Sequence, residues 1–367
     1  MGALGRLYRN ETAVDFTRVW PRMLIVSAVA VAVCVVSLLV RPLALGIDFE
    51  GGTSWEVPGV ELDVGEVRDA LRPYGQEGAR IQTIGGDTIR VQSGTDDAEV
   101  AEEVRVALAE LGGIEPTDVA VTTVGPSWGD EITSAALRAL VWFFAAIALY
   151  MTVRLEWKMA VGGLVAVFHD IIITVGVYSI FQFDVTPATV IAFLTILGYS
   201  LYDTIVVFDQ IRDNSVKVGA SNRLTYAAMA SLSVNQVMMR SLNTTITSVL
   251  PILSMLVIGS VALGAVTLQE FAIALLIGLL TGAYSSLFVA TPIVVWLKER
   301  EEPNRQIRRR LASVDTHAAV TAARTGERAP DVPDGEPSAV DVAEGEGAKP
   351  ATWSGNHPPR PRKNRRR

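Results

Sequence analysis

Six long apolar segments constrain the fold of this chain more than any other feature of its sequence. They lie at about 23–40, 134–152, 159–180, 187–208, 241–262 and 271–297, and each carries few charged residues. A helix that rises about 1.5 Å per residue needs roughly 20 apolar residues to cross a hydrocarbon core of about 30 Å. The sequence therefore predicts a multi-pass membrane protein with six transmembrane helices at these boundaries.

The first apolar segment follows an arginine-bearing N-terminus, residues 1–22, as the apolar part of a signal peptide also does. The segment is long for a signal peptide, and Arg41-Pro42 follows it instead of the small residues of a cleavage site. We therefore expect an uncleaved first span.

The positions of lysine and arginine predict the orientation of the chain, because short loops that carry these residues stay in the cytoplasm. The loops near Phe183 and at 263–270 carry none of them. Both termini are therefore expected to be cytoplasmic, as is a loop at 209–240, and residues 41–133 are expected outside. The basic residues that indicate this are Arg154, Lys158, Arg212, Lys217, Arg223, Lys298 and Arg300.

Residues 41–133 have the pattern of a small α+β domain. Strands are expected at 53–57, 79–84, 88–92 and 119–124, and helices at 64–74 and 98–111, with a turn at Gly85-Gly86-Asp87. The order β-α-β-β-α-β is that of a ferredoxin-like domain, in which two helices cover one face of a sheet.

The charge distribution separates this domain from the rest of the chain. The net charge is −7, and acidic residues concentrate between 48 and 131. Such a surface argues against a specific nucleic-acid partner. It is consistent either with a solvated face or with a docking surface.

The C-terminal segment, 298–367, is expected to be a disordered cytoplasmic tail, because it lacks hydrophobic periodicity and is rich in Pro, Gly, Glu and Asp. Its last residues are basic and suit anionic membrane lipid, ribosomal RNA or an acidic partner. A tail that is merely solvated explains them equally well.

Ionisable side chains within the apolar segments are candidates for function, because burying a charge in hydrocarbon costs several kcal/mol. Asp203 lies in the fourth segment, roughly 9 Å deeper than Asp209 if the rise is about 1.5 Å per residue. His169 and Asp170 lie near the middle of the third segment. No direction can be assigned to their side chains from the sequence.

The fifth segment begins with a polar stripe that starts at Arg240 and includes Asn243 and Thr244. The fourth and fifth segments are antiparallel neighbours, so Arg240 is expected to reach Asp203. An arginine that moves would change the proton affinity of the carboxylate, which is the minimum requirement of a proton relay. A static buried pair that fixes helix packing is the alternative, and packing is the favoured interpretation for His169 and Asp170.

No pattern typical of an enzyme is present. The sequence has no nucleophile elbow, phosphate-binding loop or metal-ligand spacing, and Cys34 is its single cysteine. We therefore expect no catalysis, no cofactor and no metal.

Several motifs resemble those of the SecD/SecF family of the bacterial Sec protein-export machinery, over about residues 20–298. The first is the segment from Gly46 through Asp48, Phe49, Gly51 and Gly52 to Thr53. Others are the segments 124–127, 154–157, 169–174, 198–209 and 240–244. The chain departs from the family pattern at Glu50, Trp128 and Tyr202, and the last of these lies beside Asp203.

This resemblance implies a membrane fold like half of a resistance-nodulation-division transporter and a location in the bacterial plasma membrane. It implies a heterodimer with SecD that uses the proton-motive force to help draw a polypeptide outward in late export. The SecYEG channel, SecA and YajC are further implied partners. It also implies that Asp203 and Arg240 form the proton pathway.

Two other functions remain open from the sequence. The chain could be half of a proton-driven exporter of lipids or drugs, which would then have to dimerise. It could also be a translocon scaffold that conducts no protons.

Overall fold

The structure is a computed structural model that describes residues 14–58, 62–84, 88–217, 224–262 and 266–311. Six helices within these residues are long and apolar enough to cross a membrane, which confirms the predicted number. The first four are α2 (Phe16–Val40), α6 (Pro126–Arg154), α7 (Trp157–Phe181) and α8 (Pro187–Lys217). The fifth is α9 (Tyr226–Ser254), continued by a π-helical segment, Met255–Ala262. The sixth joins α10 (Val266–Ser285), a π-helical segment at Ser286–Ala290 and α11 (Thr291–Lys298).

The helices extend further into the range 209–240 than the expected loop allows. Helix α8 continues to Lys217, and α9 begins at Tyr226 with Thr225 as its N-cap. Asn214 donates a hydrogen bond of 2.8 Å to Ser233 between the two helices. Hydropathy misses these turns because polar residues such as Asn214 and Ser233 are interspersed with the apolar residues that the turns bury.

The expected disorder of 298–367 is wrong for the start of that range. Helix α12 occupies Glu302–Arg310, with Pro303 in its first turn and three arginines in its last. Lys158 donates a hydrogen bond of 2.7 Å to Glu301, which ties this segment to the start of α7. Residues 312–367, including the basic C-terminal end, lie outside the described residues, as do residues 1–13 and the turn at 85–87.

Between α2 and α6 the chain forms a unit with the element order β-α-β-β-α-β. Its elements are β2 (Gly52–Val57), α4 (Val64–Leu71), β3 (Arg80–Ile84), β4 (Thr88–Ser93), α5 (Ala98–Gly112) and β5 (Ala120–Val124). Short 3₁₀ turns follow α4 at Arg72–Tyr74 and precede β5 at Pro116–Asp118. The strands form an antiparallel sheet in the order β3-β4-β2-β5.

The alternation of side chains along the strands gives the sheet two different faces. Trp55 and Val91 lie opposite each other on β2 and β4, and both are buried beneath α4 and α5. Trp55 also donates a hydrogen bond of 2.8 Å from its indole nitrogen to the carbonyl of Ala101 in α5. The next positions, Glu56 and Arg90, point to the other face, where the ends of the membrane helices lie.

Two short elements join this unit to the helices. Strand β1 (Ala44–Leu45) follows α2 and pairs in parallel with β6 (Asp184–Val185), which lies between α7 and α8. The one-turn helix α3 (Ile47–Glu50) then leads into β2. The loop before α8 and the exit of α2 are therefore held together.

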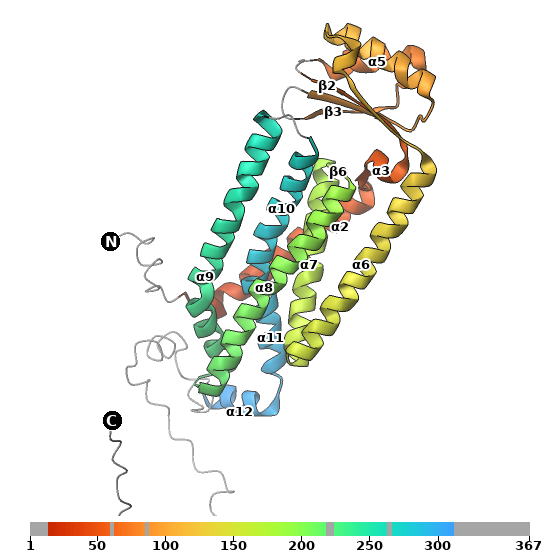
Figure 1. The fold of residues 1–367 in the computed structure, drawn as a ribbon. Helices are drawn as coiled ribbons and strands as arrows, with labels where there is room; N and C mark the ends of the chain where they lie inside the picture. The colour runs from red at the N-terminus through yellow and green to blue at the C-terminus, as the bar shows by residue number, and fades with distance from the viewer. Residues whose placement is uncertain (1–13, 59–61, 85–87, 218–223, 263–265, 312–367) are drawn as a thin grey trace, which may run out of the picture. The chain divides into compact units, whose positions relative to one another are not determined.

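Helices α7, α8 and α10 form the interior of the bundle, and Figure 1 shows them between α6 and α9. Glycines permit the close packing. A Cβ atom on Gly176 of α7 would lie 2.9 Å from the Cα of Cys34 in α2, and one on Gly282 of α10 would lie 3.2 Å from the Cα of Ser200 in α8. Helix association in a membrane relies on small residues of this kind.

Gly282→Ala is expected to destabilise the bundle, because its methyl group would push α10 away from the backbone of α8. Overpacking of this kind costs about 1–3 kcal/mol. Gly198→Ala is the matched control, since no atom lies within 4 Å of its Cβ position. The thermal unfolding midpoint of the detergent-solubilised protein should fall for Gly282→Ala and hold or rise for Gly198→Ala. Equal midpoints for the two variants would contradict this packing.

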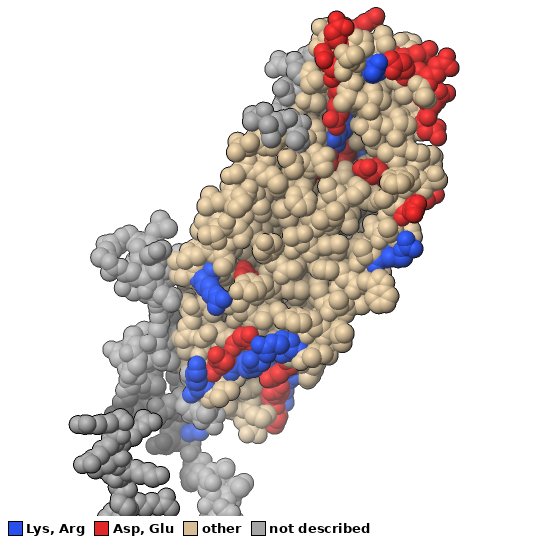
Figure 2. Space-filling view, viewed as in Figure 1, with Lys and Arg blue, Asp and Glu red and all other residues tan. Residues whose placement is uncertain are grey.

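Charged side chains are segregated on the visible face of the molecule. Figure 2 shows acidic residues over the β-α-β-β-α-β unit and most of the lysine and arginine at the other end of the bundle. A band with few charges separates them. This is the charge pattern of a protein that spans a membrane.

Candidate functional site

Asp203 lies on α8 and faces the middle of α9. Its side chain is half-buried, and the hydroxyl of Ser241 on α9 donates a hydrogen bond of 3.0 Å to Asp203 Oδ2. Arg240, one residue before Ser241, is exposed and donates from Nη2 to the hydroxyl of Tyr202 at 3.2 Å. The antiparallel α8–α9 pair thus brings the two predicted proton-pathway residues to one place.

Arg240 and Asp203 are neighbours without a direct bond. Among the described residues, no ion pair joins them, although the guanidinium is close enough to act electrostatically on the carboxylate. The hydroxyl of Tyr202, a departure from the family pattern, takes the hydrogen bond from Arg240.

The surface around this pair is polar and uncovered. Tyr199 and Tyr202 on α8 are 52% and 53% exposed, and Arg240 and Asn243 on α9 are exposed as well. An arginine facing hydrocarbon is costly, so such groups face protein or a water-filled path. The α8–α9 face is therefore expected to meet either protein or a water-filled path.

Asp170 forms a second and fully buried polar centre. It is 1% exposed, and its Oδ2 accepts hydrogen bonds from Ser200 of α8 at 2.6 Å and from Ser285 of α10 at 2.9 Å. Its Oδ1 lies 3.1 Å from Nδ1 of His169, whose ring packs on that of Tyr284 with centroids 6.3 Å apart. Three core helices meet at this carboxylate.

Asp170→Asn is expected to keep the fold, because the amide oxygen still accepts the serine hydroxyls. Asp170→Leu should destabilise it, because Ser200 loses its acceptor and an unsatisfied buried hydroxyl costs about 1–3 kcal/mol, whereas Ser285 keeps the carbonyl of Gly282 at 3.2 Å. The thermal unfolding midpoint of the purified protein should decrease from wild type to Asp170→Asn and further to Asp170→Leu. An Asp170→Asn variant that unfolds at as low a temperature as Asp170→Leu would contradict this expectation.

The other predicted polar residues lie apart from Asp170. Asp209 is near the end of α8 remote from the sheet, 3.2 Å from Arg212 and 3.7 Å from Arg154. Thr244 donates a hydrogen bond of 3.0 Å to the carbonyl of Arg240 within α9, and Asn243 is exposed on the same helix. Within the described part of the chain, no hydrogen bond connects these three groups into one network.

The segment Gly46–Thr53 forms the junction between α2 and the sheet. The amide of Gly46 donates to the carbonyl of Val185 at 2.9 Å. Gly51 and Gly52 have φ values of 78° and 118°, and a Cβ on Gly52 would lie 2.9 Å from the Cα of Gly94. Glycine is the residue that such backbone conformations accept. Thr53 closes the segment with a hydrogen bond of 2.7 Å to the carbonyl of Thr95.

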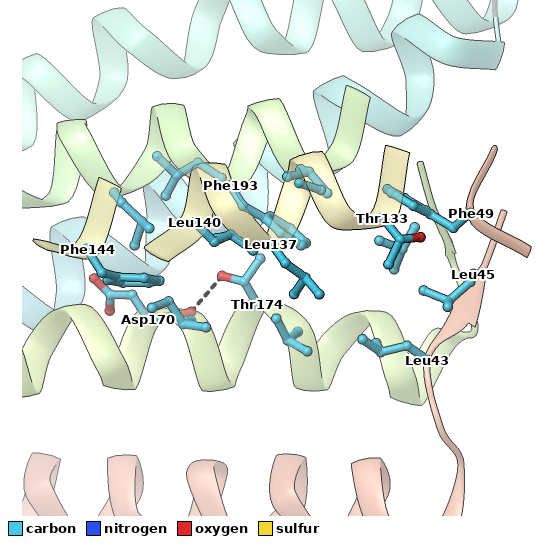
Figure 3. A pocket seen from close by; sticks show the side chains of 17 residues that line it. Leu43, Leu45, Phe49, Thr133, Leu137, Leu140, Phe144, Asp170, Thr174 and Phe193 are labelled. Atoms are coloured by element: carbon cyan, nitrogen blue, oxygen red, sulfur yellow. Dashed lines mark hydrogen bonds between the residues drawn. The ribbon is translucent and has the colours of Figure 1, made fainter. Parts of the chain in front are cut away.

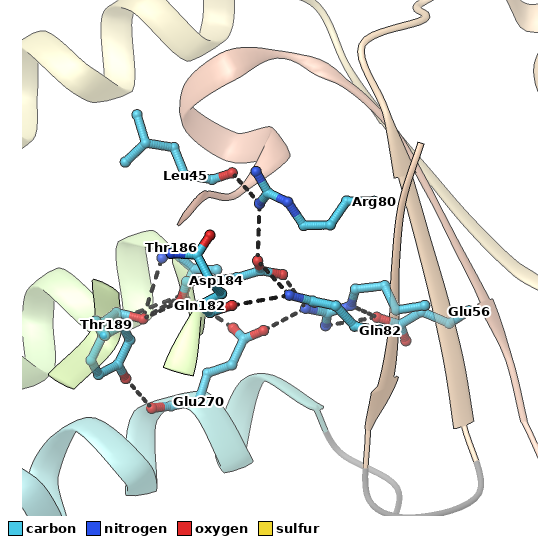
Figure 4. Close-up of polar contacts among 11 residues, drawn as sticks. Leu45, Glu56, Arg80, Gln82, Gln182, Asp184, Thr186, Thr189 and Glu270 are labelled. Atoms are coloured by element: carbon cyan, nitrogen blue, oxygen red, sulfur yellow. Dashed lines mark hydrogen bonds and ion pairs between the residues drawn. The ribbon is translucent and has the colours of Figure 1, made fainter. Parts of the chain in front are cut away.

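A buried ion-pair cluster joins the sheet to the membrane helices, and sequence reasoning did not find it. Arg90 of β4 contacts Asp184 of β6 at 3.3 Å, Glu270 of α10 at 2.5 Å and Glu56 of β2 at 2.9 Å. Arg80 of β3 adds a contact of 3.2 Å to Asp184. Figure 4 shows these side chains converging from the sheet and from the two helix ends.

Burial and neighbouring charges shift the pKa values of Arg90 and of the nearby Asp48. Burial opposes the charge on Arg90, but the carboxylates of Glu270 and Glu56 outweigh it and raise the pKa of Arg90 above its ordinary value. Burial likewise raises the pKa of Asp48, and the positive charge of Arg90 offsets only part of that increase. The guanidinium of Arg90 is therefore the centre of the cluster, because the carboxylates of Glu56, Asp184 and Glu270 share it.

A signal for this cluster exists in the sequence. Asp184 and Glu270 are acidic residues in the two loops that lack lysine and arginine, and Arg90 is a charged residue within a strand of otherwise alternating apolar pattern. An acidic residue at a helix end can form an ion pair with an arginine on the sheet face that is turned toward it. What the sequence lacks is the information on which loop meets which strand.

Two family models match the chain. The model described as protein export membrane protein SecD/SecF, C-terminal, matches residues 103–300, and that of the SecD/SecF GG motif matches residues 36–58. The first match covers the five helices that follow the sheet, and the second covers the junction at Gly46–Thr53.

Several curated relatives are named protein translocase subunit SecF. Protein translocase subunit SecF of Streptomyces coelicolor is 36% identical over 348 residues, which cover 93% of each chain. Protein translocase subunit SecF of Mycobacterium tuberculosis is 39% identical over 322 residues, which cover 84% of this chain and 72% of that one.

Solved structures of SecDF share the fold. The crystal structure of SecDF, a translocon-associated membrane protein from Thermus thermophilus, has a TM-score of 0.71 at 30% identity. The match covers 79% of this chain and 39% of that one. SecDF in a super-membrane-facing form has a TM-score of 0.55 at 31% identity.

Proposed function

Because this chain belongs to the SecD/SecF family of protein-export membrane proteins, as a relative of SecF translocase subunits, we propose that it is an accessory subunit of the Sec translocase. Together with SecD, it uses the proton-motive force to promote late steps of polypeptide export across the plasma membrane. Homology along 93% of a curated SecF subunit is the observation that carries this proposal.

SecD is the proposed partner. The match covers 39% of the SecDF chain that this chain resembles, and SecD would supply the membrane helices of a second half. The exposed polar side chains of Tyr202, Arg240 and Asn243 indicate where that half packs, because they would otherwise face lipid. SecYEG, SecA and YajC are further proposed members of the assembly, and the unfolded polypeptide is its substrate.

The proposed topology places both termini in the cytoplasm and the β-α-β-β-α-β unit outside. The arginines and lysines at the end remote from the sheet support this orientation. We interpret the unit as a ferredoxin-like domain because of its strand order, β3-β4-β2-β5. Its first and third strands, β2 and β4, lie side by side in the centre of the sheet, as in that fold. Its two helices cover the sheet face that points away from the membrane.

In the proposed mechanism, Asp203 binds the proton. In its charged form the carboxylate is held by Ser241 and attracts Arg240, and in its neutral form it no longer attracts that guanidinium. Arg240 then rests on Tyr202. One proton that crosses a potential of 100 mV supplies about 2.3 kcal/mol, enough to shift a two-state equilibrium more than tenfold.

Helix α8 would transmit the change to the outside domain. Asp203 lies on α8, and Asp184 lies three residues before the start of this helix at Pro187. Asp184 is bound to Arg80 and Arg90 of the sheet. A shift of α8 against α9 therefore pulls directly on the domain that faces the emerging polypeptide.

Co-purification tests the partner and its position. The tagged chain, co-expressed with the SecD of its own organism, is expected to recover SecD in equal amounts from mild detergent. Replacing Tyr199 and Tyr202 together by Ala should reduce that recovery, because both rings leave the proposed interface. Trp142→Ala, which removes a 75% exposed ring from α6, is the control. Absence of SecD from the wild-type sample would contradict the partnership, and equal recovery with the double variant would contradict its position.

A further inference from the structure

An apolar cavity lies between α6, α7 and α8, apart from the Asp203 site. Its volume is 420 Å³, within the range of pockets that bind small ligands. Its walls include Leu137 and Leu140 of α6, Ile171 and Val175 of α7, and Phe193 of α8. Figure 3 shows these side chains facing one another across the space between the helices.

The cavity has the length of one leaflet of a membrane. Along α6 it runs from Thr133 to Phe144, which is roughly 16 Å for a rise of about 1.5 Å per residue. That is about half of a hydrocarbon core of about 30 Å. Its end near Thr133 lies beneath the sheet, so it occupies the half of the bundle next to the β-α-β-β-α-β unit.

Both ends of the cavity are closed by side chains. Leu45 and Phe49, from the junction segment, close the end beneath the sheet. Phe144 closes the other end, with its ring stacked on Phe168 at a centroid distance of 6.1 Å. Leu137 both lines the cavity and is 59% exposed. Access is therefore from the side, where the surface of α6 faces the membrane.

Two of the three polar residues in the wall, Asp170 and Thr174, already form hydrogen bonds within the protein. Asp170 accepts hydrogen bonds from two serines, and the hydroxyl of Thr174 donates to the carbonyl of Asp170 at 2.7 Å. A water molecule needs two to four polar partners to be stable in a cavity, and apolar cavities accept apolar ligands instead. The chemistry of the wall selects a hydrocarbon chain.

A cationic residue of α6 is adjacent in sequence to the cavity wall. Arg138 follows Leu137 on α6 and is exposed, and no carboxylate forms an ion pair with it among the residues that the structure describes. An arginine stem lies along apolar surface while its guanidinium reaches the interface, where it meets lipid phosphate. Arginine also recognises phosphate oxygens with two parallel hydrogen bonds.

We propose that this cavity is a phospholipid site, in which one acyl chain of a lipid from the leaflet next to the β-α-β-β-α-β unit fills the space between α6, α7 and α8 and its phosphate contacts Arg138. The lipid would link α6, which continues directly from β5, to the two core helices that carry Asp170 and Asp203. The site is independent of proton movement, so it would exist even if the chain were a scaffold.

Photolabelling tests the site in the complex with SecD, reconstituted in lipid nanodiscs. A phosphatidylglycerol with a diazirine on one acyl chain is expected to crosslink to Leu140 and Phe193, mapped by peptide mass spectrometry. Leu140→Trp should reduce labelling of Phe193 about tenfold, an energy of about 1.4 kcal/mol, because indole fills the cavity. Val141→Trp, one residue on and 67% exposed, should leave it unchanged.

Two further variants make the result decisive. Ala136→Phe fills the same cavity from another position, so loss of label in both filling variants, with unaltered unfolding midpoints, is not a folding defect. Arg138→Gln should weaken labelling by the phospholipid and leave labelling by a diacylglycerol probe unchanged. Equal labelling of the wild type and both filling variants would overturn the proposal, as would crosslinks from the cavity to SecD or to a translocating polypeptide in place of lipid.

Discussion

Asp203→Asn is expected to abolish the stimulation of export by the proton-motive force. The amide keeps the size of the side chain and accepts the hydrogen bond from Ser241, but it does not titrate. Export in membrane vesicles that contain SecD should fall to the level measured when the proton gradient is dissipated, and dissipating the gradient should then have no further effect. The readout is the fraction of a preprotein that becomes protected from protease, with and without an uncoupler.

Asp209→Asn is the matched control for this experiment. It removes a carboxylate from the same helix, but one that already pairs with Arg154 and Arg212 near the end of the bundle. Its export should keep its dependence on the gradient. Arg240→Gln should resemble Asp203→Asn, because the charge that responds to the proton is gone. Full gradient-dependent export by Asp203→Asn would show that the proton binds elsewhere.

Arg90→Gln is expected to cause the largest loss of stability of any single change outside the hydrophobic core. The buried carboxylate of Glu270 would lose its counter-charge and Asp184 would keep only Arg80, and removing one partner of a buried pair costs about 3–5 kcal/mol. Thermal unfolding of the purified protein should therefore begin at a lower temperature. Limited proteolysis should cut first in the β-α-β-β-α-β unit, whose attachment to the helices is weakened.

Arg72→Gln provides the comparison for Arg90. Arg72 pairs with Asp69 at 3.0 Å, but both side chains are about 70% exposed, so the pair contributes at most about 1 kcal/mol. A second test restores the balance: adding Glu270→Gln to Arg90→Gln should recover part of the lost stability, because one unpaired charge is removed. If Arg90→Gln and Arg72→Gln unfolded at the same temperature, the cluster would not hold the domain.

The parts of the fold that could be predicted are those with a strong local pattern. Long apolar segments give membrane helices whatever their neighbours are, and the alternation at Trp55, Glu56 and Val57 marks a strand with one buried face. The extension of α8 and α9 into the range 209–240 was missed because polar residues that form buried hydrogen bonds, such as Asn214 and Ser233, are interspersed there with buried apolar residues. Hydropathy is insensitive to a helix that buries hydrogen bonds.

The site could be predicted only where one helical hairpin contains it. Asp203 and Ser241 meet because α8 and α9 are consecutive and antiparallel, whereas the bond from Arg240 to Tyr202 depends on rotamers that no pattern reveals. Asp170 and its serine donors come from three helices, and Arg90 lies more than 90 positions from Asp184 and Glu270. Contacts of this kind are set by tertiary packing.

The most direct test of the account is proton movement itself. Proteoliposomes that contain this chain with its SecD, a pH-sensitive dye inside and an imposed membrane potential should acidify when the Sec channel and a translocating polypeptide are present. The account predicts that Asp203→Asn stops this acidification while SecD still co-purifies and Asp209→Asn conducts normally. Proton movement through the Asp203→Asn complex at the wild-type rate would contradict it.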